Sequence, residues 1–192
     1  LAKLGCLNER TIAVHCVALS DRDIGLLAES GASVVHCPVS NMRLGCGASP
    51  VVKLLKAGIN VALGTDGAAS ACSLSMFEQM RTAGLIAKGF SQDPTELTVN
   101  QIIRMATING ANALKLHCDV GSLAVGKLAD LAVIDMSQLV TMPVLDVLSN
   151  VIYAVEAQCV HQVWVSGSLV ANIQQEKLLR PDRGKLLTKS NI

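Results

Sequence analysis

Apolar and polar positions alternate along the first third of the chain in blocks of strand and helix length. Short runs of apolar and β-branched residues at 11–16, 32–37 and 59–66 predict three strands. Between them, residues 20–31 and 50–58 carry apolar side chains at helical spacing, and each segment ends at a glycine. Because the strands are apolar on both faces, the sequence predicts a strand–helix–strand–helix–strand unit with a buried parallel sheet.

The rest of the pattern predicts helices and then further strands. Residues 38–47 are rich in Asn, Ser and Gly and predict a loop. Residues 73–88 and 98–116 have the apolar spacing of two helices, and residues 121–130 have the composition of a turn-rich linker. Three more strands are predicted at residues 131–135, 160–165 and 169–172, with a Gly-Ser turn before the last.

The change of pattern predicts how the chain is divided. We expect residues 1–118 to form the α/β part, residues 119–180 a strand-rich part, and residues 181–192 a polar tail. Of the 192 residues, 51% are hydrophobic and only 2% aromatic. A sizeable core of Ala, Val, Leu and Ile is therefore expected, which favours alternating strands and helices over an aromatic-rich sandwich.

Charge and cysteine usage exclude several classes of protein. The net charge is +1 and the basic residues are scattered, which argues against nucleic acid as a partner. No apolar run reaches membrane-spanning length, so no membrane association is expected. The seven cysteines are irregularly spaced without a CxxC pair, which indicates reduced core thiols and a cytoplasmic location.

Three polar residues with catalytic potential end the three predicted strands: His15, His36 and Asp66. In parallel α/β folds the carboxyl edge of the sheet is where ligands bind. Imidazole and carboxylate groups can hold a divalent metal or move a proton. A single histidine at a strand end is more often structural, but three such residues at consecutive strand ends favour a functional site.

Several motifs in order along the chain resemble one enzyme superfamily. They are His15-Cys16, the run HCPVSN at 36–41, Gly64-Thr65-Asp66-Gly67, TINGANALKL at 107–116 and VGSLAVGKLADLAVID at 120–135. From about Leu7 to Asn172 the sequence is similar to the amidohydrolase superfamily. Within it, the sequence resembles the group of methylthioadenosine/S-adenosylhomocysteine deaminases and triazine chlorohydrolases.

The resemblance implies a fold and a set of roles. It implies the C-terminal part of a (β/α)8 barrel, with strands six to eight ending at His15, His36 and Asp66, followed by part of a small β-sandwich. Asp66 would be a ligand of Zn²⁺, would contact substrate and would accept a proton from the attacking water. His15 would hydrogen-bond that water, and His36 would contact the substrate. Asn41 is expected to order its own loop.

The chain departs from the group's pattern in one respect. It contains no His-x-His pair, because its four histidines are isolated. The missing ligands are expected upstream of Leu1, so the metal site would be incomplete and the chain alone inactive.

Three readings of the function remain from the sequence. The first is hydrolytic deamination of an adenine-type nucleoside or a related heteroaromatic ring, by a full-length enzyme that could form homo-oligomers. The second is a chlorohydrolase or another ring hydrolase of the same superfamily. The third is a truncated or partner-completed half-barrel without activity. A dinucleotide-binding fold is discounted because the turn after the first strand, residues 17–20, has no G-x-G-x-x-G.

Overall fold

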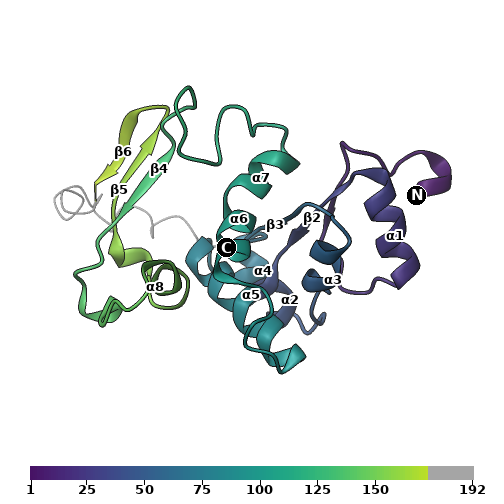
Figure 1. The fold of residues 1–192 in the computed structure, drawn as a ribbon, viewed down its shortest axis with the longest axis horizontal. Coiled ribbons are helices and arrows are strands. Elements are labelled where there is room, and N and C mark those ends of the chain that lie inside the picture. The colour runs from purple at the N-terminus through teal and green to yellow at the C-terminus, as the bar shows by residue number, and fades with distance from the viewer. Residues whose placement is uncertain (173–192) are drawn as a thin grey trace, which may run out of the picture.

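The first sheet of the computed structural model, which describes residues 1–172, has three parallel strands (Figure 1). They are β1 (Ile12–Val14), β2 (Ser33–His36) and β3 (Val61–Leu63), in the order β1–β2–β3. The register places Ala13 beside Val34, and His36 beside Leu63. The predicted α/β class with a parallel sheet is confirmed. The predicted tail at 181–192 lies outside the described residues.

Helices α1 (Asp21–Ser30) and α3 (Val51–Lys56) connect these strands. Helix α1 begins where the Ser20 side chain accepts a hydrogen bond from the Asp23 N–H and the Asp23 carboxylate accepts one from the Ser20 N–H. This reciprocal cap satisfies two backbone donors that the helix itself cannot pair. The helix ends at Gly31 in the left-handed conformation, as the sequence predicts.

The predicted loop at 38–47 is wrong in its first half, because residues Pro38–Arg43 form helix α2. Proline suits the first turn of a helix, since its fixed φ is helical and its missing N–H has no partner there in any case. The helix also buries the polar side chains of Ser40 and Asn41. The tertiary environment of these residues therefore overrides a loop-like composition.

Four helices follow β3. They are α4 (Ala68–Ala71), α5 (Met76–Ser91), α6 (Val99–Ala106) and α7 (Ile108–Ala113). The helix predicted at 73–88 corresponds to α5, whereas the single helix predicted at 98–116 is divided at Thr107. There the backbone leaves the helical region, at φ −130° and ψ −98°, and the Thr107 hydroxyl donates to the Ile103 carbonyl at 2.7 Å. The short helix α4 was not predicted.

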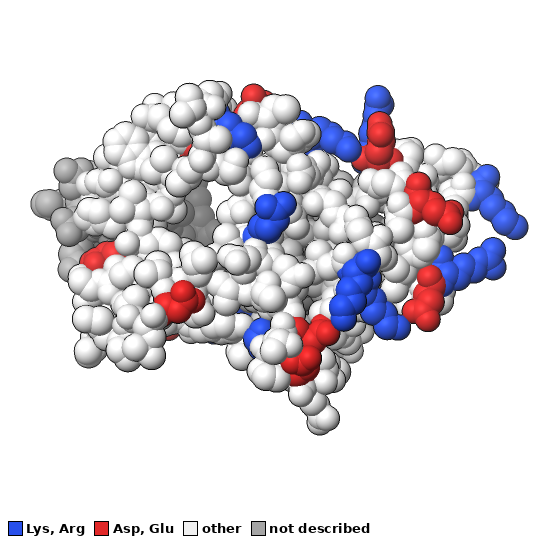
Figure 2. Space-filling model, in the orientation of Figure 1, with Lys and Arg blue, Asp and Glu red and all other residues white. Residues whose placement is uncertain are grey.

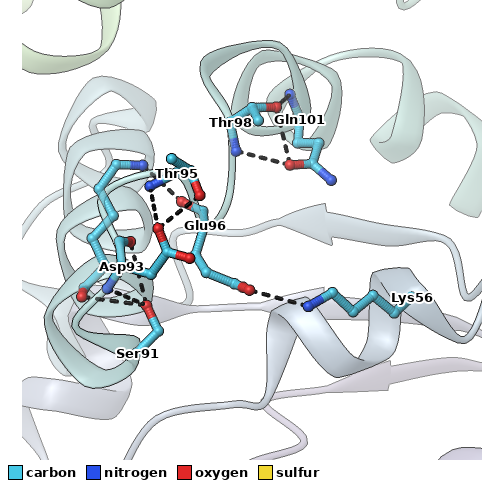
Figure 3. A network of polar contacts seen from close by, with 8 residues as sticks. Lys56, Ser91, Asp93, Thr95, Glu96, Thr98 and Gln101 are labelled. Atoms are coloured by element: carbon cyan, nitrogen blue, oxygen red, sulfur yellow. Dashed lines mark hydrogen bonds and ion pairs between the residues drawn. The ribbon is translucent and has the colours of Figure 1, made fainter.

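A polar network holds the connection between α5 and α6 (Figure 3). The Asp93 carboxylate accepts hydrogen bonds from the N–H and the hydroxyl of Thr95, at 2.8 and 2.7 Å. Glu96 forms an ion pair of 3.0 Å with Lys56 of α3. Helix α6 then begins with a second reciprocal cap between Thr98 and Gln101. The network therefore orders this connection, and its ion pair links the connection to α3.

The second sheet is antiparallel, in the order β4–β5–β6. Its strands are β4 (Leu131–Ile134), β5 (Val160–Val165) and β6 (Ser168–Asn172). These agree with the predicted strands. Helix α8 (Val147–Tyr153), between β4 and β5, was not predicted. Short 3₁₀ turns complete the elements at Ala2–Leu4, Leu139–Thr141 and Ala157–Cys159.

Helix α8 joins the strand-rich part to the core of the α/β part. It contacts α5 and α6, and its Ile152 belongs to the same buried cluster as Val34 of β2 and Ile102 of α6. In Figure 1 the second sheet and α8 lie at the opposite end of the molecule from α1. The boundary predicted at residue 118 stays a prediction, but the core crosses it.

The charged side chains are mixed in sign. On the face shown in Figure 2, basic and acidic side chains lie beside one another at the end that carries α1 and α3, whereas the end with the second sheet carries few charges. Among residues 1–172, no helix has the length and apolar character needed to cross a membrane.

Candidate functional site

The parallel sheet brings His15 and Asp66 together at its carboxyl edge. His15 follows β1 and Asp66 comes three residues after β3, with β2 between them. Their side chains face each other, with His15 Nε2 at 3.9 Å from Asp66 Oδ2. This distance is too long for a hydrogen bond, but it lets one water molecule contact both atoms. The side chains are 41% and 28% exposed, so solvent reaches the pair.

His15 sits in a strained turn that ends β1. Its φ is +70°, and the N–H of Cys16 donates to the Val14 carbonyl at 2.9 Å, across a single residue. A three-residue turn with a positive φ at its centre is rare and strained. Cys16 is left-handed as well, at φ +50°. Such backbone outliers cluster at functional sites, which supports a functional reading of His15.

Two residues of the segment after β2 stabilise this turn. Asn41 Oδ1 lies 2.8 Å from His15 Nδ1, and the Ser49 hydroxyl donates to the Cys16 carbonyl at 3.1 Å. Both Asn41 and Ser49 are buried. Asn41 therefore holds the side chain of the strained turn, and Ser49 contributes a hydrogen bond to its backbone.

Asp66 is held in a similar way. It has a positive φ of +60°. The Ser40 hydroxyl donates to its Oδ2 at 2.6 Å, and the Gly67 N–H donates to its Oδ1 at 2.7 Å. These bonds, first that of Ser40 and then that of Gly67, lower the pKa of Asp66 below its ordinary value, because both favour the ionised carboxylate. Asp66 is thus prepared as an anion with a fixed orientation.

His36, the last residue of β2, is near His15 but lines a separate cleft. It is 1% exposed and lines a cleft of about 290 Å³ with residues of α3 and α5, including Val51, Ala83 and Phe90. Burial lowers the pKa of His36 to about 4, and the nearby His15 contributes in the same direction. Its Nδ1 has no hydrogen-bond partner. His36 therefore faces the helix layer as a neutral imidazole, and its predicted contact with substrate stays a prediction.

The sequence reasoning missed the partners of the two candidate catalytic residues. Asn41 is expected from the sequence to order its own loop, but its oxygen faces His15. The role of Ser40 as a partner of Asp66 is not predicted by the sequence pattern. The available signal was the position of both residues directly after a strand that lies between the strands of His15 and Asp66. Residues just beyond the end of a central strand can reach the ends of both neighbouring strands.

The described residues do not by themselves form a metal centre. No group of three His, Cys, Asp or Glu side chains within residues 1–172 is placed to hold a metal ion. Asp66 could supply one carboxylate ligand, whereas a zinc site in a protein uses three or four protein ligands. His15 is already engaged by Asn41 through Nδ1. The residues that are described thus supply one ligand of a zinc site.

Comparisons with known proteins agree with the fold. The model of the amidohydrolase family matches residues 1–170. The chain is 46% identical over 168 residues to the 5-methylthioadenosine/S-adenosylhomocysteine deaminase of Moorella thermoacetica, a match that covers 88% of this chain and 39% of that protein. The chain therefore spans about two fifths of the length of this relative.

Two solved structures are also similar to this chain over about two fifths of their own length. An adenosine deaminase from Xanthomonas campestris with bound zinc superposes with a TM-score of 0.84 and 46% identity, over 87% of this chain and 38% of that one. An atrazine chlorohydrolase from Arthrobacter aurescens, also crystallised with zinc, has a TM-score of 0.80 and 26% identity, over 90% of this chain and 40% of that one.

Proposed function

Because the chain belongs to the amidohydrolase family, we propose that it is the C-terminal portion of a zinc-dependent deaminase acting on an adenine-type nucleoside. The similarity to a methylthioadenosine/S-adenosylhomocysteine deaminase supports this substrate class. The three parallel strands would be strands six to eight of a (β/α)8 barrel, and residues 119–172 part of a β-sandwich. The observation that carries the proposal is the facing pair of His15 and Asp66 at the carboxyl edge.

The two side chains have complementary roles in this proposal. A water between them would donate one proton to Asp66 Oδ2, because the carboxylate is held ionised and can accept it. His15 Nε2 would fix the orientation of the same water. Loss of ammonia from the purine ring needs such a proton carrier, since the leaving amine must be protonated.

Zinc is the proposed cofactor, and Asp66 the ligand that this chain contributes. When bound, a zinc ion lowers the pKa of water toward neutrality. The other ligands would come from residues that the described part of the chain does not contain. We therefore expect the 192-residue chain alone to be inactive toward nucleosides.

Reconstitution tests the proposal. The chain is co-expressed with the N-terminal part of the Moorella thermoacetica deaminase, the part that it does not match. Zinc content and ammonia release from adenosine-type nucleosides are then measured. We expect both to appear, and Asp66→Asn to lower zinc content and to abolish turnover. Asp21→Asn is the control, because Asp21 is an exposed carboxylate whose partner is Lys53. Unchanged zinc content in Asp66→Asn would contradict the ligand assignment.

Two alternatives have support of their own. The similarity to an atrazine chlorohydrolase favours displacement of chloride from a triazine ring, so chloride release from atrazine is assayed in parallel. Within the described residues, β1 and β3 each pair with one strand only, which favours a half-barrel completed by a partner chain. Size-exclusion chromatography of the chain alone tests this second alternative, because open edges promote association.

A further inference from the structure

We infer that Ser40 and Asn41 are positioning residues, which together set the orientation and hydrogen-bonding state of the Asp66–His15 pair. The inference deepens the proposed function, because it concerns the same pair and adds the residues that prepare it. Its test nevertheless includes a measurement that requires no catalysis.

The geometry is that of one short segment serving two strands. Ser40 and Asn41 are consecutive in α2, and each is 1% exposed. Asn41 reaches back 26 residues to His15 after β1, and Ser40 reaches forward 26 residues to Asp66 after β3. Since β2 lies between β1 and β3, the helix that follows it can contact both ends at once.

Asn41 determines which nitrogen of His15 carries hydrogen. The oxygen of an amide only accepts hydrogen bonds, so a contact between Asn41 Oδ1 and His15 Nδ1 requires hydrogen on Nδ1. The neutral imidazole then has its lone pair on Nε2, the nitrogen that faces Asp66. Nε2 in this tautomer can accept a hydrogen bond from a water held at Asp66, whereas in the other tautomer it could only donate.

Ser40 has the corresponding effect on Asp66. Its hydroxyl donates to Oδ2 while the Gly67 N–H donates to Oδ1, so the two hydrogen bonds oppose rotation of the carboxylate group. Both bonds fix the direction in which the carboxylate presents its remaining lone pairs, so Asp66 meets water with a set orientation.

Helix α2 is itself anchored, as a positioning element must be. The Val39 N–H donates to the buried Gln79 side chain of α5 at 3.3 Å. The Arg43 guanidinium donates through Nη1 to the carbonyls of Ala69 and Ser70 in α4, at 2.8 and 2.7 Å. The helix is thus held from both sides, and it contacts the segment that follows Asp66.

Nitrogen-15 NMR of the imidazoles in the metal-free 192-residue chain, at about pH 8, tests the assignment of the tautomer. We expect His15 Nδ1 to be of the N–H type. Asn41→Leu removes the acceptor and should give a mixture of tautomers, whereas Asn41→Asp retains an acceptor and should retain hydrogen on Nδ1. His36 serves as the internal reference, because its environment is the cleft between α3 and α5.

Either of two results would overturn the inference for Asn41. One is a His15 Nδ1 without hydrogen in the unmodified chain. The other is an unchanged His15 spectrum in Asn41→Leu. Should Asn41→Leu fail to fold, the unmodified chain and Asn41→Asp decide the question by themselves.

Kinetics of the reconstituted enzyme add a second readout. Ser40→Ala and Asn41→Leu should each lower kcat by roughly tenfold to a hundredfold with little change in KM, as is usual for residues that orient a metal site. Ser30→Ala, at the far end of α1, is the control with unchanged kinetics. If Ser40→Ala had the same kcat as the unmodified enzyme, positioning of Asp66 by Ser40 would be excluded. Absence of turnover in every variant, the unmodified enzyme included, would contradict the deaminase proposal but not the NMR result.

Discussion

Gly84 of α5 packs so closely against Tyr153 of α8 that a Cβ at Gly84 would lie 2.7 Å from the Tyr153 hydroxyl oxygen. The same Cβ would lie 2.9 Å from Cδ1 of Ile102, which is fully buried. The missing side chain at Gly84 thus allows the helix of the strand-rich part to approach the core of the α/β part.

Gly84→Ala should destabilise the chain. The added methyl group forces Tyr153 and Ile102 to move, which in a packed core costs about 1–3 kcal/mol. This exceeds the gain of up to about 1 kcal/mol from replacing glycine by alanine in a helix. The shift of the urea midpoint measures the difference.

Gly89→Ala is the matched control in the same helix. Nothing lies within 4 Å of a Cβ at Gly89, so the substitution should stabilise the chain by about 0.5–1 kcal/mol. If the two variants had equal stability, the close packing of α8 on α5 would be contradicted.

The stability of the chain should fall as the pH decreases from about 6.5 to about 4, in part because of His36. In the folded chain its pKa is lowered from 6.5 to about 4, so between these values the unfolded chain binds a proton that the folded chain does not. Unfolding therefore becomes more favourable as pH falls, by up to about 3 kcal/mol once the pH is below both values.

His36→Leu tests this dependence. The variant removes the titrating group and retains an apolar side chain in the cleft, so its unfolding free energy should vary less between pH 6.5 and 4.5 than that of the unmodified chain. Urea unfolding at several pH values gives both curves. Parallel curves would show that His36 does not titrate with the lowered pKa.

Parts of this fold and site follow from local patterns, and other parts depend on contacts distant in sequence. The positions of His15 and Asp66 were predictable, because consecutive parallel strands end at one edge of a sheet. The contact between Asn41 and His15 was not, because the composition of residues 38–47 favours a loop and nothing local indicates the helix.

Helix α8 shows the same limit. Its seven residues are too few to form a stable helix alone, and it depends on burying Ile152 against α5 and α6. The left-handed backbone of His15 is equally invisible in the sequence, since few residues other than glycine adopt a positive φ. Such features arise from tertiary packing.

Ser40→Ala should raise the pKa of Asp66 in the metal-free chain toward its ordinary value. The Ser40 hydroxyl is the first cause of the lowered pKa, and alanine leaves only the Gly67 N–H as a close donor. Carbon-13 NMR of the carboxyl group across acidic pH measures the change.

Asp23 provides the comparison within the same titration. Its pKa is also lowered first by a serine hydroxyl, that of Ser20. Ser40→Ala should leave the pKa of Asp23 unchanged. Ser20→Ala should raise the pKa of Asp23 but not that of Asp66. A shift of both carboxyl groups in one variant would indicate a general change of structure.

The two lysines near the α5–α6 connection should differ in their effect on stability. Lys88 Nζ donates to the backbone carbonyls of Glu96 and Leu97, at 2.7 and 3.1 Å, and is partly buried. Lys88→Met leaves both carbonyls without this donor and should cost about 1.5–3 kcal/mol. Lys56 forms an exposed ion pair with Glu96 (Figure 3), and Lys56→Met should cost at most about 1 kcal/mol.

Urea unfolding at low and high salt distinguishes the contributions of the two lysines to the unfolding free energy, because salt screens the Lys56 pair more strongly than the hydrogen bonds of Lys88. A larger loss of unfolding free energy in Lys56→Met than in Lys88→Met would mean that the ion pair contributes more to this connection than the hydrogen bonds of Lys88 do.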